Sequence, residues 1–204
     1  MRLERQQTIK QDVSISGTGL HTGQKGTLTF HPAPENHGIK FRRVDVDGQP
    51  VVDAKVENVV DTSRGTTIAQ NGVRVYTVEH ILASLRGAGV DNVLIDIDCE
   101  EPPIQDGSAR NMIEALKSAG IVEQNAEREY LRIKNSLTYF HPKIGCEIVI
   151  EPADDFRMEV SVDYNSKVLK PQTAVLENMN DFEKEIAPCR TFVFFQELEM
   201  LLNH

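Results

Sequence analysis

The sequence of 204 residues has no tryptophan, and aromatic residues make up only 6% of it. It also lacks any apolar run close to the roughly 20 residues that a membrane-spanning helix needs, so no transmembrane segment is expected. The charged residues 1–6 are not followed by the apolar stretch of a secretory signal. These absences predict a cytoplasmic protein.

Cysteine and basic residues are also scarce. The three cysteines, Cys99, Cys146 and Cys189, lie far apart and form no Cys-x-x-Cys pair, which argues against a disulfide framework or a cysteine zinc site. Lysine and arginine number 22 against 31 acidic residues, which gives a net charge of −9. Because no basic excess is present to neutralise phosphates, a nucleic-acid partner is not expected. The hydrophobic fraction of 40% suffices for a folded core in one large domain or two small ones.

Strand patterning is abundant in the first part of the chain. Alternation of apolar and polar residues over 27–30 and 39–44 predicts strands. Asn71 and Gly72 stand between two β-rich runs, and this dipeptide favours the tight turn of a hairpin because both turn positions need positive φ.

Two amphipathic helices are expected between these strands and the middle of the chain. Thr77 is a plausible N-cap for the first helix, which should stop near Gly87 or Gly89. Ser108 is the predicted N-cap of the second, and Gly120 should end it.

The polar residues 123–129 have no periodicity and predict a linker. Strand patterns resume beyond it, at 130–133, 146–150 and 158–162. This order predicts an α+β fold with two domains, residues 1–125 and residues 126–204. The second domain looks too short to cover its own sheet with helices, so we expect it to be incomplete.

The pair Glu79 and His80 at the start of the first helix is the most informative candidate for chemistry. A neutral imidazole is a common zinc ligand, and a neighbouring carboxylate can accept a proton from metal-bound water. On this pattern alone a solvated helix start is the simpler interpretation, because a catalytic zinc site needs about three protein ligands. None of the six histidines pairs with another ligand at helical spacing.

Three other segments have both a structural and a functional interpretation. The glycine-rich residues 17–23 let backbone approach a ligand, although a flexible turn between strands also fits. Asp106 could be functional, or it could form a turn and helix cap with the two residues that follow it. The aromatic side chains of Phe192 and Phe194 could pack in a core or line an apolar ligand site.

Considered together, five segments are far more specific than any one of them. They are Gly19–Gly23, Thr77–His80, Gly89–Asn92, Pro103–Ala109 and Arg190–Phe192. In this order they resemble the UDP-3-O-acyl-N-acetylglucosamine deacetylase family, the zinc amidohydrolases of lipid A synthesis, along essentially the whole chain. Residues 61–66 and the run 192–194 resemble the subgroup that is fused to a 3-hydroxyacyl-carrier-protein dehydratase.

The resemblance implies two α+β domains, each a sheet with two helices, with the helices packed between the sheets. It implies Zn²⁺ as cofactor, His80 as one ligand, Glu79 as general base and Thr191 as hydrogen-bond donor to the oxyanion. It also implies contacts with the substrate, a UDP-linked acylated N-acetylglucosamine. The residues implied for these contacts are Leu20, His21, Phe192, Phe194, Tyr164 and Glu197.

The same resemblance identifies what this sequence does not contain. The other two zinc ligands of the family lie in a His-Lys-x-x-x-Asp motif, and this motif is absent from the 204 residues. The histidine that serves as general acid follows later in the family. We therefore expect the chain to hold the first domain and part of the second. The alternative is that these 204 residues form a non-catalytic domain. The sequence does not predict an oligomeric state.

Overall fold

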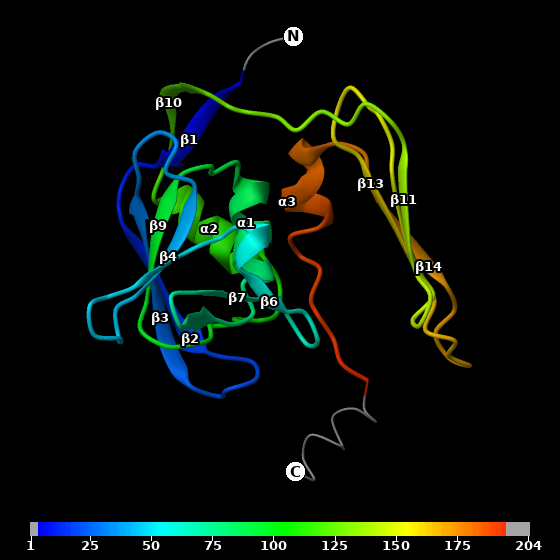
Figure 1. Cartoon of the computed structure of the whole chain (residues 1–204), viewed down its shortest axis with the longest axis horizontal. Coiled ribbons are helices and arrows are strands. Elements are labelled where there is room, and N and C mark those ends of the chain that lie inside the picture. Colours follow the sequence, from blue (N-terminus) through cyan, green and yellow to red (C-terminus); the bar gives the residue numbers. More distant parts are fainter. Residues whose placement is uncertain (1–3, 195–204) are drawn as a thin grey trace. The chain divides into compact units, whose positions relative to one another are not determined.

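The computed structural model describes residues 4–194 and divides the chain into two compact units. Unit 1 comprises Met1–Glu127 together with Glu183–His204, and unit 2 comprises Arg128–Phe182. Figure 1 shows the elements of both units along the chain. The mixture of helices and strands confirms the predicted α+β class.

Unit 1 is built on a five-stranded sheet. Its strands, in spatial order, are β2 (Val13–Thr18), β3 (Lys25–Pro32), β9 (Val93–Ile97), β4 (Ile39–Arg43) and β5 (Val51–Asp53). The central strand β9 runs antiparallel to β3 and parallel to β4. Alternate residues of β3 and β9 are buried, so one face of the sheet forms the core, and for β3 this confirms the alternation over residues 27–30.

A smaller three-stranded sheet leads the chain toward the first helix. It contains β6 (Val59–Asp61), β7 (Thr67–Gln70) and β8 (Val73–Val75), after the short helix η1 (Val56–Asn58). The turn between β7 and β8 has φ values of 53° at Asn71 and 80° at Gly72. Two positive φ angles in succession are the signature of a type I′ turn, so the predicted hairpin is confirmed.

The predicted linker at 123–129 is wrong over most of its length. Strand β10 (Ile121–Glu127) pairs antiparallel with β1 (Arg5–Ile9), near the start of the chain. Most residues of β10 are exposed and none is fully buried, which explains its polar composition. A partner so distant in sequence leaves no local signal.

The two longest helices of unit 1 in the described residues, α1 (Glu79–Ala88) and α2 (Arg110–Ser118), pack against each other. Gly89 ends α1 in the left-handed conformation and Gly120 follows the end of α2, as predicted. Both predicted N-caps are wrong in position. The caps are Val78 and Ala109, and neither has a side-chain hydrogen bond.

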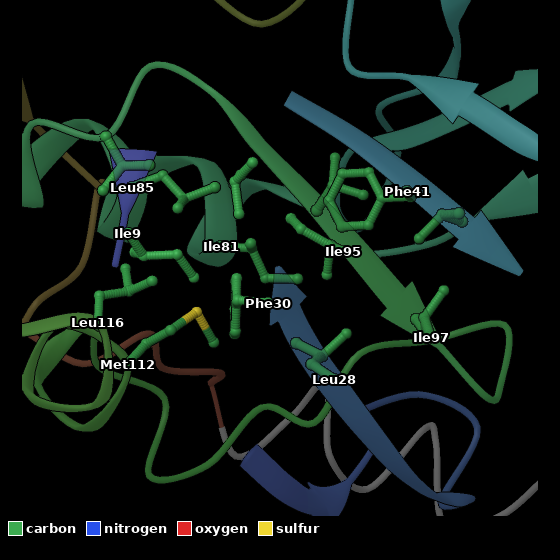
Figure 2. Close-up of a cluster of buried hydrophobic side chains, with 14 of the residues drawn as sticks. Ile9, Leu28, Phe30, Phe41, Ile81, Leu85, Ile95, Ile97, Met112 and Leu116 are labelled. Carbon is green, nitrogen blue, oxygen red and sulfur yellow. The ribbon is translucent and has the colours of Figure 1, made fainter. Parts of the chain in front are cut away.

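The core lies between these helices and the buried face of the large sheet. Figure 2 shows Ile81 of α1 and Met112 of α2 directed toward Phe30 and Ile95 of the sheet. All four are at most 3% exposed. Burial of a side chain of this size stabilises a fold by roughly 1.5–3 kcal/mol, so the core fixes where the first turn of α1 begins.

Unit 2 consists of two antiparallel hairpins. One pairs β11 (Leu137–His141) with β12 (Cys146–Ile150), and the other pairs β13 (Met158–Val162) with β14 (Gln172–Leu176). The short helix η2 (Met179–Asp181) follows, and α3 (Phe182–Glu185) begins at the last residue of unit 2 and continues into unit 1. The strand predicted at 130–133 does not form. Leu131 is 92% exposed there, so the apolar pattern buries no face.

Among residues 4–194, no helix is long and apolar enough to cross a bilayer.

Candidate active site

Glu79 and His80 occupy the first turn of α1, and both are half-buried. One carboxylate oxygen of Glu79, Oε2, accepts the backbone N–H of Thr66 at 2.7 Å. The backbone of Gly65 passes beside the other oxygen, because a Cβ built on this glycine would lie 3.0 Å from Oε1. The loop before β7 therefore fixes the orientation of the carboxylate. A fixed, half-buried carboxylate beside an imidazole can act as a proton acceptor.

Thr77, just before this pair, has an unusual backbone conformation. Its φ is +50°, in the left-handed region that β-branched residues rarely adopt. Its neighbour Val78 donates its N–H to the carbonyl oxygen of Thr66 at 3.1 Å. The hydroxyl of Thr77 does not cap the helix but donates to Oε1 of Glu101 at 2.9 Å. This bond is the physical reason why the predicted N-cap role of Thr77 fails.

Glu101 is the residue that sequence analysis missed. It is fully buried, and its carboxylate accepts the backbone N–H groups of His21, at 2.9 and 3.0 Å, and Thr22, at 2.7 Å. Burial raises the pKa of its carboxyl, but the donors from Thr22, His21 and Thr77 outweigh burial and bring the pKa below its usual value. Glu100 and Glu101 are adjacent residues of the same type, so nothing in the sequence indicates which of them is functional. In the structure Glu100 is exposed and Glu101 is buried.

The glycine-rich residues 17–23 form a turn whose backbone is held by hydrogen bonds to the Glu101 carboxylate. A Cβ on Gly19 would lie 2.6 Å from Oε2 of Glu101, so only glycine fits there. The same segment meets the loop that follows Glu101, because the N–H of Ile104 donates to the carbonyl oxygen of Thr18 at 3.1 Å. The turn leaves Leu20 48% exposed, and His21 is exposed beside it. Both side chains are therefore available to a ligand.

The segment Asp106–Ser108 forms a turn that also contacts Thr191. Asp106 accepts both the N–H and the hydroxyl of Ser108, and these bonds lower the pKa of its carboxyl. The Ser108 hydroxyl oxygen in turn accepts the N–H of Arg110. Gly107, with a φ of +82°, accepts the N–H of Thr191 at 3.0 Å. The exposed side chain of Thr191 is thereby held near the start of α2.

The aromatic candidates lie at the end of the described region. The rings of Phe192 and Phe194 contact each other edge to face, with centroids 5.5 Å apart. Residues 191–194 are not in a strand. Tyr164, which is 40% exposed, belongs to unit 2. Glu197 lies outside the described residues.

Hydrogen bonds thus bring several of the predicted site segments together. The turn with Leu20 and His21 is joined through Glu101 to Thr77, which precedes Glu79. The described residues contain no group of three or more His, Cys, Asp or Glu side chains that could hold a metal ion. They offer His80 as a single candidate ligand.

Comparison with known proteins agrees with these motifs. A family model described as UDP-3-O-acyl N-acetylglycosamine deacetylase matches residues 6–204. The chain is 44% identical, over 98% of its length, to the bifunctional enzyme LpxC/FabZ of Bacteroides thetaiotaomicron, and 45% identical to the enzyme of that name from Porphyromonas gingivalis. It is 41% identical, over 97% of its length, to the UDP-3-O-acyl-N-acetylglucosamine deacetylase of Saccharophagus degradans.

The chain spans only part of these relatives. It covers 43% and 44% of the two bifunctional enzymes and 65% of the Saccharophagus enzyme. The family match nevertheless extends from β1 to the last residue. The chain belongs to the UDP-3-O-acyl N-acetylglycosamine deacetylase family.

Proposed function

We propose that this chain is part of a zinc-dependent deacetylase that hydrolyses the N-acetyl group of UDP-3-O-(3-hydroxyacyl)-N-acetylglucosamine, the committed step of lipid A biosynthesis. The family match supports the reaction, and one observation supports the site. The carboxylate of Glu79 is held by the N–H of Thr66 at the opening of α1, with His80 beside it. The alternative of a non-catalytic domain has less support, because the relatives carry the names of enzymes.

In the proposed reaction Glu79 acts as the general base. It accepts a proton from the attacking water, and such a contribution typically accelerates a reaction by about 10²–10⁴-fold. Thr191 donates its hydroxyl to the carbonyl oxygen of the acetamide as negative charge develops there. One oxyanion donor is worth roughly 10²–10³ in kcat. The contact between Thr191 and Gly107 supports this role, because it fixes the backbone that carries the hydroxyl.

Zinc is part of the proposal only through His80. The described residues lack a group of three ligands, so they do not form a zinc site by themselves and no step above is assigned to the metal. We propose His80 as one ligand, with the others supplied by parts of the enzyme beyond these residues. A single imidazole holds zinc weakly. The isolated 204-residue chain should therefore bind less than one equivalent of zinc and release no acetate.

The proposed substrate contacts are those that the family resemblance implies. Leu20 and His21, on the turn above Glu101, would border the cleft. Phe192 would contact the hexosamine, and Phe194 and Glu197 would lie toward the acyl chain. Tyr164 would stack on uracil. Whether a dehydratase domain is fused to this enzyme, and its cytoplasmic location, stay predictions.

Acetate release by the full-length protein is the direct test. The purified protein is incubated with UDP-3-O-acyl-N-acetylglucosamine, and acetate and zinc are measured. Glu79→Ala should lower kcat by about 10²-fold or more while zinc content stays unchanged, because the general base is lost but the ligand His80 is kept.

Glu114→Gln is the matched control. This glutamate lies exposed on α2, and its variant should keep full turnover. Full turnover in Glu79→Ala would exclude the role of Glu79, and no acetate release by the unmodified enzyme would exclude the proposed reaction.

A further inference from the structure

Glu101 is a buried carboxylate to which the proposed reaction assigns no role. Its side chain is completely excluded from solvent, and it is the only acidic residue among the largest fully buried side chains of the described region. A buried charge is costly unless hydrogen bonds compensate it. Three donors do so here, namely the N–H groups of His21 and Thr22 and the hydroxyl of Thr77.

These donors come from two segments that are far apart in sequence. His21 and Thr22 belong to the glycine-rich turn, whose side chains are exposed, whereas Thr77 leads directly into the first turn of α1. The N–H of Tyr76 also donates to the carbonyl oxygen of Glu100 at 2.9 Å, so the backbone, too, ties the segment before α1 to the segment of Glu101. One carboxylate therefore sets the spacing between the turn and the helix start.

Two features of the surrounding backbone depend on the Glu101 carboxylate. Gly19 leaves room for Oε2 that any larger residue would fill. Thr77 keeps a φ of +50° against the preference of a β-branched residue. Strained conformations of this kind persist only where neighbouring contacts impose them, and they occur frequently at functional sites.

We propose that Glu101 is a positioning residue of the active site, which holds the turn bearing Leu20 and His21 at a fixed distance from Glu79 and His80. The inference rests on the proposed function, since it assigns the turn to substrate binding and Glu79 to proton transfer. Glu101 itself touches no reacting atom. Its loss displaces the turn relative to the helix start.

Glu101→Gln in the full-length protein tests the role. The amide has nearly the same shape, but it is neutral and keeps only one acceptor oxygen. The bonds from the turn N–H groups are therefore no longer charge-assisted, and the N–H of His21, which lies within reach of both oxygens, keeps one acceptor in place of two. We expect KM to rise and kcat to fall, with kcat/KM lower by about 10-fold or more, because a small misplacement of binding groups costs that much. A role in stability alone would reduce the active fraction and leave KM unchanged.

Hydrogen exchange at the amides of His21 and Thr22 gives a readout that does not depend on turnover. Both should exchange at least about 10-fold faster in Glu101→Gln, since weaker hydrogen bonds to a neutral acceptor favour local opening. Asp91→Asn is the matched control. The carboxylate of Asp91 accepts the N–H of Gln7 at 2.8 Å beyond the other end of α1, so this variant should leave KM and both exchange rates unchanged.

Thr77→Val provides a milder second variant if Glu101→Gln folds poorly. It removes one donor and should also raise KM. In the double variant Glu101→Gln/Thr77→Val, kcat/KM should fall by less than the product of the two separate decreases, because both variants act on the same bond between the Thr77 hydroxyl and Glu101. Unchanged KM in both single variants, or unchanged exchange at His21 and Thr22, would overturn the positioning role. If the unmodified enzyme releases no acetate, the proposed function fails, while the exchange rates still decide whether Glu101 fixes the turn.

Discussion

The hydroxyl of Thr77 lies 2.9 Å from Oε1 of Glu101, and both residues are buried. This single bond connects the segment that opens α1 with the loop that follows β9. It also takes the hydroxyl away from the N-cap position, so α1 begins without a side-chain cap. The start of the helix is therefore fixed by a tertiary contact and by the packing of Val78 and Ile81, not by local capping.

Thr77→Val should lower the free energy of unfolding by about 1–3 kcal/mol, because a hydrogen bond to a buried charge is lost. Valine is also β-branched, so the strain at φ +50° stays and does not confuse the comparison. Thr77→Ser keeps the hydroxyl and should remain closer to the unmodified protein. Urea unfolding followed by circular dichroism suits this chain, which has no tryptophan to report fluorescence. Equal midpoints for the valine and serine variants would contradict the assigned bond.

The sequence predicted those parts of the fold that depend on local signals. The Asn71-Gly72 turn needs two positive φ angles, and Gly89 needs one, so both elements could be predicted without knowledge of their neighbours. The buried face of β3 followed from the alternation over residues 27–30. Each of these signals lies within a few residues of the structure that it predicts.

Contacts between distant segments could not be predicted in the same way. Strand β10 is polar because most of it faces outward, and only its pairing with β1 makes it a strand. Glu101 was missed because burial and three donors from elsewhere in the chain, not its neighbours, set its role. The motif order indicated which segments to expect near a site, whereas the hydrogen bonds that join some of them required the structure.

Acid should destabilise the protein partly through Glu101. Burial raises the pKa of this carboxyl, but the donors outweigh it and hold the pKa in the folded state below the usual 4.5. The unfolded chain therefore binds the proton more tightly, and the stabilisation is complete above about pH 5 and is lost as pH falls through the lowered pKa. Urea unfolding between about pH 7 and pH 3 should show this loss. Glu101→Gln, which cannot titrate, should show a smaller decrease over the same range, and an identical decrease would contradict the assignment.

The three cysteines should differ sharply in reactivity. Cys99 is buried, and burial, with a smaller effect of Asp98, raises the pKa of its thiol to about 11, whereas Cys146 and Cys189 are exposed. Because the thiolate is the reactive form, iodoacetamide at about pH 8 should label the two exposed thiols and leave Cys99 unlabelled until the chain unfolds. Mass spectrometry of the peptides separates the sites. Cys99→Ala should leave the labelling of the native chain unchanged, and rapid native labelling of Cys99 would contradict its burial.

Gly107→Ala should affect both stability and turnover. Its φ of +82° costs an alanine about 1–2 kcal/mol, and the new Cβ would lie 3.3 Å from Cγ2 of Thr191, which must then shift by a few tenths of an ångström. Gly48→Ala separates the two effects, because Gly48 has a φ of +78° and nothing within 4 Å of the added carbon.

Both variants should therefore lose stability, but only Gly107→Ala displaces the hydroxyl that we propose as the oxyanion donor. In the full-length enzyme we expect kcat to fall by about 10-fold or more in Gly107→Ala, since oxyanion donors act only within a narrow range of distances. Gly48→Ala should keep the unmodified kcat once the folded fraction is taken into account. If the two variants lose the same stability and both keep full kcat, the contact of Gly107 with Thr191 has no part in catalysis.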